Sequence, residues 1–202
     1  MVRNLIIQIF LGEEEKLEDF PKFVMNKNRW ESYCDKMGFQ YLFFDRYNIQ
    51  KYLGVHEKFY YSLEFTWQRI DFIRYLILNQ EGGLYFDMDT YPNPDMDLKE
   101  LLDQRYILNY WTNPKNNIPE VNNAIMGVEP GDFDDLIQFS ISETERLRMI
   151  KIYRCWKIRF MKRSTGVCMF KKWCKKKKMS YTPCLHEYVT DEMTCSWIKN
   201  FH

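Results

Sequence analysis

Apolar residues fall in short runs along the first half of the chain, and glycine, proline or acidic residues bound each run. Uninterrupted apolar runs of this length are typical of buried strands, and they predict strands at 4–12, 38–45 and 84–90. Helical spacing of apolar residues covers two longer stretches, 14–37, which Pro21 interrupts, and 57–80. Glycine is favoured just past a helix end, so we expect Gly82 and Gly83 to end the second helix.

The second half of the chain continues this alternation. Residues 100–111 read as a short helix followed by a strand, and residues 122–147 as a strand, a turn and a helix. Strands alternating with helices predict an α/β fold with a largely parallel central sheet flanked by helices. A chain of 202 residues has the length of one domain, and we expect that domain to span 1–202.

Composition narrows the class of protein. Hydrophobic residues make up 46% of the chain and aromatic residues 17%, which argues against disorder. No run of about 18 apolar residues occurs, so we expect no transmembrane helix. The apolar amino-terminal stretch leads into acidic residues without a small-residue cleavage site, so a strand fits better than a signal peptide, and we expect a cytoplasmic protein.

Six cysteines without CxxC spacing favour free thiols over disulfides, with a structural zinc site as the weaker alternative.

The net charge of +1 hides a strong asymmetry along the chain. Residues 1–145 hold 14 Lys and Arg against 25 Asp and Glu, whereas residues 146–178 hold 14 Lys and Arg and no acid. We expect this basic segment to be helical, either as a solvated cover of the core or as a docking face for an anionic membrane or an acidic partner. It contains no recognisable nucleic-acid motif, so no nucleic-acid partner is expected.

Two carboxylates stand at the end of an apolar strand in GGLYFDMDTYPNP, residues 82–94. Strand alternation would place Tyr85, Asp87 and Asp89 on one side and the apolar residues between them on the other. Paired hard oxygen ligands suit Mg²⁺ or Mn²⁺, which take one or two protein carboxylates and complete their shell with waters and substrate phosphates. A solvated loop is the alternative interpretation of so short a motif.

The helix before this strand carries an acid and a base one turn apart. Asp71 and Arg74 share a helix face with Trp67 and Leu78. The pair is either a polar clamp beside the two carboxylates or an exposed intrahelical ion pair of little energetic consequence.

Together these residues resemble a known family. RIDFIRYLILNQEGGLYFDMD, residues 69–89, is similar to the central signature of glycosyltransferase family 32, the DXD sugar-binding group, which includes fungal initiating mannosyltransferases. The clostridial toxin glucosyltransferases share this core. Further similar stretches are IIQIFLG, NRWESYCDKMGFQYLFFD, NNAIMGVEPGDFDDLI, STGVCMF and EMTCSWIK. Phe10, Asp132 and Val167 stand where the family usually has tryptophan, histidine and proline.

The resemblance implies a GT-A fold and a retaining glycosyltransferase. Such an enzyme would move a hexose from a UDP- or GDP-sugar to a hydroxyl of a glycan, a protein or a lipid-linked acceptor. The implied cofactor is Mn²⁺ or Mg²⁺ on the donor diphosphate, and peripheral contact with a membrane is a further expectation.

The resemblance also implies roles for individual residues. Ile9 and Phe10 would bind the nucleotide base, and Asp71, Arg74 and Asn123 would surround the donor sugar. Asp87, beside Tyr85, would hold ribose and sugar hydroxyls, while Asp89 would ligate the metal directly with Asp87 acting through water. Glu192 would be a further metal-side group. Ser196 and Trp197 would close over the diphosphate. The catalytic set is Asp71, Arg74, Asp87 and Asp89.

A second class of function is a non-catalytic module that binds an anionic membrane or nucleic acid through residues 146–178. A hydrolase with an acid and a nucleophile on opposite sides of a sugar fits less well, because Asp87 and Asp89 would point the same way. Whether retention proceeds through a covalent intermediate, or with the leaving phosphate as the base, stays open.

Overall fold

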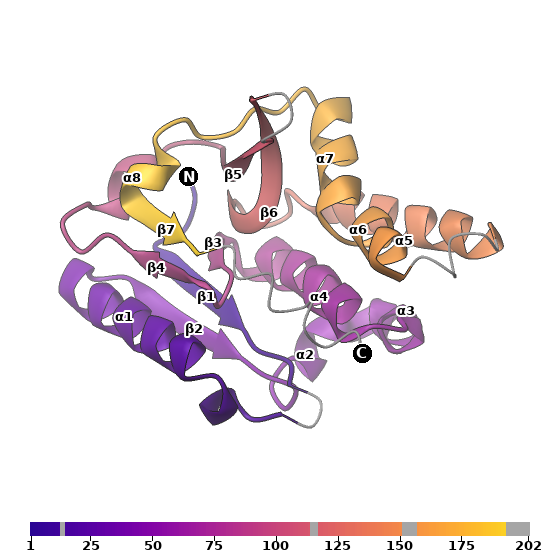
Figure 1. Cartoon of the computed structure of the whole chain (residues 1–202), viewed down its shortest axis with the longest axis horizontal. Helices are drawn as coiled ribbons and strands as arrows, with labels where there is room; N and C mark the ends of the chain where they lie inside the picture. Colours follow the sequence, from indigo (N-terminus) through magenta and orange to yellow (C-terminus); the bar gives the residue numbers. More distant parts are fainter. Residues whose placement is uncertain (13–14, 114–116, 151–156, 193–202) are drawn as a thin grey trace.

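The protein is described by a computed structural model over residues 1–12, 15–113, 117–150 and 157–192 (Figure 1). A five-stranded sheet runs in the order β2–β1–β3–β6–β5. Its strands are β1 (Leu5–Ile9), β2 (Gln40–Phe44), β3 (Gly83–Phe86), β5 (Tyr106–Asn113) and β6 (Ile118–Val128). The predicted α/β fold is confirmed.

The sheet is mixed, which corrects the expectation of a largely parallel one. β1 pairs in parallel with β2 and β3, whereas β6 pairs antiparallel with both β3 and β5. Only four residues separate β5 from β6, and a parallel pairing would need a crossover of a dozen or more residues. The short connection therefore makes these two strands a hairpin.

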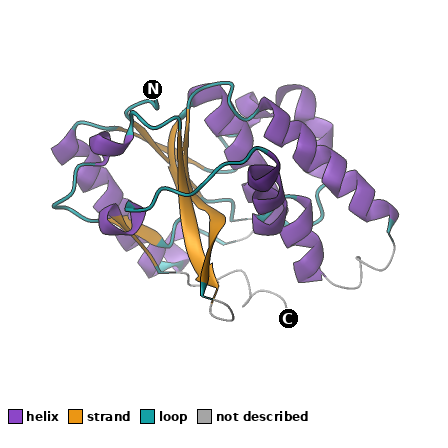
Figure 2. Cartoon of the chain, turned by 90° about the horizontal axis from the view of Figure 1, so that it is seen from above, coloured by secondary structure: helices purple, strands orange, loops and turns teal. Residues whose placement is uncertain are grey.

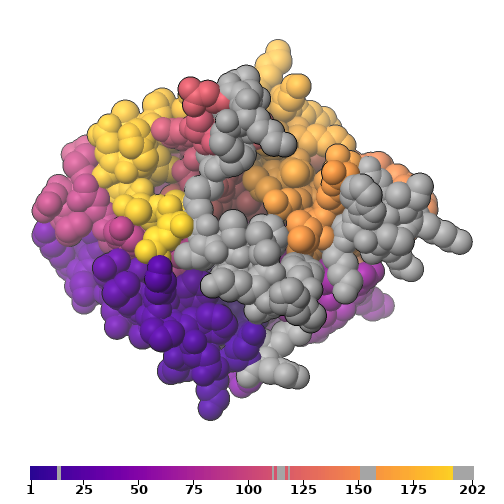
Figure 3. Space-filling model, viewed as in Figure 1, coloured from indigo at the N-terminus to yellow at the C-terminus, as the bar shows by residue number. Residues whose placement is uncertain are grey.

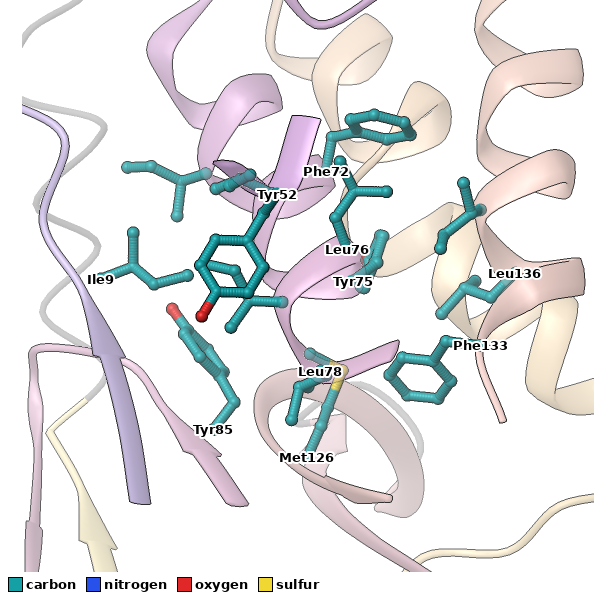
Figure 4. Close-up of a cluster of buried hydrophobic side chains, with 14 of the residues drawn as sticks. Ile9, Tyr52, Phe72, Tyr75, Leu76, Leu78, Tyr85, Met126, Phe133 and Leu136 are labelled. Atoms are coloured by element: carbon teal, nitrogen blue, oxygen red, sulfur yellow. The ribbon is translucent and has the colours of Figure 1, made fainter. Parts of the chain in front are cut away.

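Helices cover both faces of the sheet, as the edge-on view shows (Figure 2). One face packs against α1 (Pro21–Met37) through Trp30 and Tyr33. The other packs against α4 (Thr66–Glu81), α5 (Asp134–Met149) and α7 (Val167–Lys176). Apolar side chains of β1 and β3 alternate between the two cores, so both strands are buried on both faces. Figure 4 shows the α4 side, where Tyr75 and Tyr85 lie among aliphatic side chains.

The helix boundaries differ from the predicted ones for local reasons. Pro21 does not interrupt a helix but begins one, because a first-turn residue needs no N–H donor. It follows the short η1 (Leu17–Asp19), and α1 ends at Gly38, whose φ of 71° is the left-handed conformation that glycine adopts without strain. The helix expected over 57–80 is two helices, α3 (Glu57–Ser62) and α4, and α4 ends at Gly82 as predicted.

The remaining elements are short. α2 (Gln50–Leu53) and η2 (Gly54–His56) precede α3, and η3 (Leu98–Leu101) precedes β5 as expected. A two-stranded sheet joins β4 (Thr90–Pro92) to β7 (Val189–Asp191), which follows α8 (Leu185–Tyr188). Sequence patterning did not predict this pair, because a three-residue strand carries too few positions to show alternation.

The basic segment 146–178 is not a separate helical appendage. Its described parts are the end of α5, then α6 (Lys157–Ser164) and α7. α7 buries Met169, Phe170, Trp173 and Cys174 in the core. Three of its lysines form ion pairs with acids of the same molecule, Lys171 with Glu120, Lys172 with Glu143 and Lys177 with Asp135. Part of the positive charge is therefore neutralised internally.

The structure bears on the predictions about the cysteines and about transmembrane helices. Cys34, Cys168, Cys174 and Cys184 are free thiols, and the other two cysteines lie outside the described residues. Within the described ranges, each helix is too short or too polar to cross a bilayer.

Candidate active site

The DXD carboxylates lie in a turn at the carboxyl end of β3. The strand ends at Phe86, and the Thr90 amide donates to the Asp87 carbonyl at 3.1 Å, which closes a turn over Asp87, Met88 and Asp89. The prediction that strand alternation continues through both carboxylates is therefore wrong. Tyr85 points to the α4 side of the sheet, where it is fully buried.

Neighbouring elements hold this turn by its main chain. Gln8 of β1 donates its side-chain amide to the Asp87 carbonyl at 3.3 Å. From α1, Asn26 donates to the Met88 carbonyl at 3.2 Å, and the Trp30 indole donates to the Thr90 carbonyl at 3.0 Å. Because Gln8, Asn26 and Trp30 are fully buried, their donors have no competing water, and the turn is fixed to both β1 and α1.

A pocket of about 560 Å³ opens beside the turn, between the end of β1, the start of α4 and the junction of α6 with α7. Figure 3 shows the amino-terminal elements in indigo and the carboxy-terminal helices in orange on opposite sides of one face. The pocket brings together most residues that the sequence nominated: Ile9, Phe10, Asp71, Arg74, Tyr85, Asp87, Asp89 and Asn123. Glu192 does not line it, and Ser196 and Trp197 lie outside the described residues.

Asp71, Arg74, Asp87 and Asn123 form a polar floor in the pocket, and Arg74 lies at its centre. Its guanidinium donates to the Asn123 carbonyl at 2.7 Å and lies 3.3 Å from an Asp71 oxygen and 3.2 Å from an Asp87 oxygen. It also lies over the Tyr85 ring at 4.6 Å. The Arg74 side chain is only 5% exposed, so the interpretation of Asp71 and Arg74 as an exposed surface pair is wrong. Burial opposes its charge, yet Asp87, Tyr85 and Asp71 together raise the pKa of Arg74.

Asp71 has hydrogen bonds to both carboxylate oxygens. The Asn123 side-chain amide donates to Oδ1 at 2.9 Å, and the Thr165 hydroxyl lies 3.4 Å from Oδ2. Burial raises the pKa of Asp71, and the Arg74 charge and these two hydrogen bonds oppose that rise. Asn123, Thr165 and Arg74 together therefore hold this carboxylate in one orientation.

Acidic groups outnumber basic groups around Asp87. Burial, with the charges of Asp89 and Asp191, raises the pKa of Asp87 to about 7, against the opposing effects of Arg74 and of the Tyr85 hydroxyl. The Tyr85 hydroxyl donates a short hydrogen bond to Asp87. One arginine thus faces several carboxylates, and a bound cation would relieve their repulsion.

The donor set fits a divalent cation. Glu192 lies next to the turn, because its amide donates to the Asp89 carbonyl at 3.0 Å. Its Oε2 is buried without a hydrogen-bond partner among the described residues, and Oε1 lies 3.8 Å from Lys22 Nζ. In the part of the chain that the structure describes, no three His, Cys, Asp or Glu side chains form a ready metal cluster. Carboxylates at this edge suit a cation that takes few protein ligands and completes its shell with phosphate and water.

The other end of the pocket is aromatic. Phe10 packs edge-to-face against Phe20 at 5.6 Å and against Phe23 at 6.4 Å between ring centroids. Phe65, just before α4, and Trp67, in its first turn, also line the pocket. An apolar slot joined to a charged floor is suited to a ligand with a flat base and a polar, anionic remainder.

Sequence reasoning missed several lining residues. Phe20, Phe23 and Phe65 lie in loops or at helix starts, and their aromatic character was the only available signal. Lys162 and Gly166 come from α6 and the junction that follows it. Gly166 lies in STGVCMF, one of the family-like stretches, but neither residue was given a role in the site.

Comparison with known proteins identifies the region that carries the polar floor. Residues 19–108, a little under half of the chain, match the sequence model of a family described as glycosyltransferase sugar-binding region containing DXD motif. The match includes Asp71, Arg74, Tyr85 and both DXD carboxylates. No curated protein matches the chain by sequence.

One solved structure supports a shared fold, and it is consistent with the GT-A type. The chain is similar to one described as PaToxG glycosyltransferase, with 12% identity, a TM-score of 0.52, and coverage of 92% of this chain and 72% of that one. It is also similar to a glycosyltransferase involved in the glycosylation of the major capsid of PBCV-1, with 16% identity, a TM-score of 0.45, and coverage of 68% and 64%. The resemblance to the DXD sugar-binding group is confirmed, while family 32 within it stays a prediction. Over residues 19–108, the chain matches a glycosyltransferase sugar-binding region, including its DXD motif.

Proposed function

We propose that this glycosyltransferase moves a hexose from a UDP- or GDP-sugar to a hydroxyl of a glycan, a protein or a lipid-linked acceptor, with retention of anomeric configuration. The observation that carries the proposal is Arg74, buried between Asp71 and Asp87 on the floor of a pocket that Asp89 also lines. A buried cation with two carboxylates provides fixed charge for a polar ligand with an anionic leaving group.

The donor lies along the pocket in this proposal. The nucleotide base binds at the aromatic end, against Phe10 and the main chain of Ile9. The sugar lies over Asp71 and Asn123, whose carboxylate and amide suit hydroxyl groups. The diphosphate lies towards Asp89.

Charge develops on the nucleoside diphosphate as the glycosidic bond breaks. Arg74 stabilises this charge, and because it is already held by Asp71, Asp87 and the Asn123 carbonyl, it needs no rearrangement when charge develops. A Mn²⁺ or Mg²⁺ ion held directly by Asp89, and by Asp87 through water, with Glu192 as a further group on the metal side, would neutralise part of the same charge. Ser196 and Trp197 are proposed to close over the diphosphate.

Retention is proposed from the family resemblance and has a direct test. Proton NMR of the sugar released or transferred early in the reaction reports its anomeric configuration. The donor's own configuration is expected in the first product, and the opposite configuration would contradict retention.

A donor screen tests the proposed function itself. Thermal melting in Mn²⁺ with UDP, GDP and their sugars should show stabilisation by one nucleotide and its sugar, because a ligand that binds only the folded state raises the melting temperature. The same donor should be hydrolysed slowly to free sugar. Stabilisation by oligonucleotides alone, lost at high salt, would support the non-catalytic module instead.

Peripheral contact with a membrane is a second proposal. Met149, Ile150 and Ile158 are exposed large apolar side chains within the basic segment 146–178. Exposed apolar groups beside cations suit the surface of an anionic bilayer.

A further inference from the structure

We propose that Thr165 and Gly166, at the junction between α6 and α7, are the wall that orients Asp71 and leaves room for the donor sugar. The inference rests on the proposed function and assigns a positioning residue and a specificity-determining residue to it. Both residues lie outside the matched region 19–108.

Thr165 completes a closed set of hydrogen bonds around Asp71. Its hydroxyl lies 3.4 Å from Asp71 Oδ2, and its carbonyl accepts from the Tyr75 hydroxyl at 2.8 Å. The Tyr75 oxygen in turn accepts from Asn123 Nδ2 at 3.2 Å, and the same amide donates to Asp71 Oδ1 at 2.9 Å. The side chains of Asp71, Asn123 and Tyr75, with the hydroxyl and the main-chain carbonyl of Thr165, form a ring that contacts both oxygens of the carboxylate. The plane of the carboxylate therefore cannot rotate without breaking a hydrogen bond.

Hydrogen bonds within α6 and contacts with α4 hold the junction in place. The amides of Thr165 and Gly166 both donate to the Met161 carbonyl, at 3.3 Å and 3.1 Å. Gln68 of α4 donates to the Ser164 hydroxyl at 2.7 Å, and Phe170 stacks on Tyr75 with ring centroids 6.1 Å apart. Because Ser164 and Thr165 are both fully buried, no water competes for these contacts. The wall therefore has a fixed position relative to Asp71.

Gly166 lines the pocket and is required there for space. Its φ of −83° and ψ of −161° are open to any residue, so backbone strain does not explain the glycine. A Cβ at this position would lie 3.0 Å from Asp71 Oδ2, 3.1 Å from the Lys162 Cα and 3.2 Å from the Met161 carbonyl oxygen. Two of these neighbours are backbone atoms of α6 and cannot move easily. An added methyl group would therefore displace the Asp71 carboxylate and fill the space beside it.

Asp71 is proposed to bind the sugar, whereas the nucleoside diphosphate binds elsewhere in the pocket. A change in the wall should therefore affect binding of the nucleotide sugar and leave binding of the free nucleotide nearly unchanged. A general loss of folded structure would weaken both ligands equally, which separates a positioning role from a purely structural one.

The test uses Thr165→Val, Thr165→Ser and Gly166→Ala in the full chain. Calorimetry in Mn²⁺ measures binding of UDP or GDP and of its sugar, and hydrolysis of that sugar donor gives kcat and KM. Thr144→Val is the matched control, because Thr144 is equally buried and donates to the Ser140 carbonyl at 2.8 Å, outside the pocket.

We expect Thr165→Val to lower kcat about tenfold, as expected for the loss of one hydrogen bond to a charged group, with nucleotide affinity unchanged and Thr165→Ser restoring most of the rate. Gly166→Ala should weaken the nucleotide sugar about tenfold and the free nucleotide less than twofold. Gly166→Ala therefore tests the role of the wall in sugar binding even if Thr165→Val does not fold. Equal loss in Thr165→Val and Thr144→Val, or equal weakening of both ligands by Gly166→Ala, would overturn the inference alone. A wild type that neither binds nor hydrolyses any nucleotide sugar would overturn the proposed function as well.

Discussion

At the scale of single residues, Arg74 determines the electrostatics of the site. An arginine that is 5% exposed is stable only with compensation, and Asp71, Asp87 and the Asn123 carbonyl provide it. Its planar fork contacts three acceptors at once, and a lysine ammonium could not reproduce that geometry. The sequence spacing predicted that Asp71 and Arg74 share a helix face. It could not show what covers that face, because Asn123 is 49 residues further along the chain.

The substitution Arg74→Lys should keep the positive charge and lose the planar guanidinium group that contacts three acceptors. We expect donor hydrolysis to fall about 100-fold, as for loss of an oriented electrostatic donor, and stability to fall by about 1–3 kcal/mol as hydrogen bonds to buried acceptors are lost. Hydrolysis kinetics and urea unfolding measure the two effects. Arg105→Lys is the control, since the Arg105 side chain is 73% exposed where it pairs with Asp132, and this substitution should change neither quantity. Unchanged hydrolysis in Arg74→Lys would remove Arg74 from the catalytic set.

At the scale of elements, α1 and β1 position the DXD turn. The helical spacing of α4, the glycines that follow it and the apolar β3 were predictable, because each is a local pattern. The turn over Asp87 to Asp89 was not predictable, because apolar and polar residues alternate there as they do in a strand. The hydrogen bonds that fix the turn come from Gln8, Asn26 and Trp30, which are distant in sequence. The antiparallel direction of β6 was missed for a similar reason, since apolar patterning is the same in either direction.

Trp30→Phe tests the contribution of α1 to the turn. Trp30 is fully buried, stacks on Phe86 with ring centroids 4.1 Å apart and donates to the Thr90 carbonyl. Loss of the indole should leave that carbonyl unpaired and a small cavity, and lower the free energy of unfolding by about 2–3 kcal/mol. Urea unfolding measures the stability, and donor hydrolysis at a temperature where the variant is folded should also fall. Full stability with normal hydrolysis would mean that the turn holds without α1.

At the scale of the whole molecule, opposite charges are separated along the chain but partly brought together by the fold. Glu120 and Glu143 of the acidic region 1–145 pair with lysines of α7, and Asp135 pairs with Lys177 just past its end. The remaining lysines at the end of α7, Lys175, Lys176 and Lys178, are exposed. Composition revealed the asymmetry but not which charges are paired, because pairing depends on how α7 packs against α5 and β6.

Replacing Lys175, Lys176 and Lys178 with glutamine tests membrane contact. Each lysine near an anionic surface contributes about 1 kcal/mol at low salt, so affinity for vesicles containing phosphatidylserine should fall about 100-fold. Hydrolysis of free donor should not change, because none of the three lines the pocket. Vesicle co-sedimentation measures the binding, with glutamine at the exposed Lys16, Lys36 and Lys51 as the charge-matched control. Equal loss in both variants, or none in either, would favour a solvated face.

The central claim is that the DXD turn and the Arg74 floor bind a nucleotide sugar with a divalent cation for transfer. The most direct measurement is hydrolysis of UDP- and GDP-sugars by wild type and Asp89→Asn, each with Mn²⁺, Mg²⁺ or EDTA. We predict that wild type hydrolyses one donor only with a cation. Asp89→Asn should be folded but inactive, because a neutral amide is a poor ligand for a hard cation. Cation-dependent hydrolysis that Asp89→Asn leaves unchanged, or no hydrolysis of any donor by wild type, would contradict the claim.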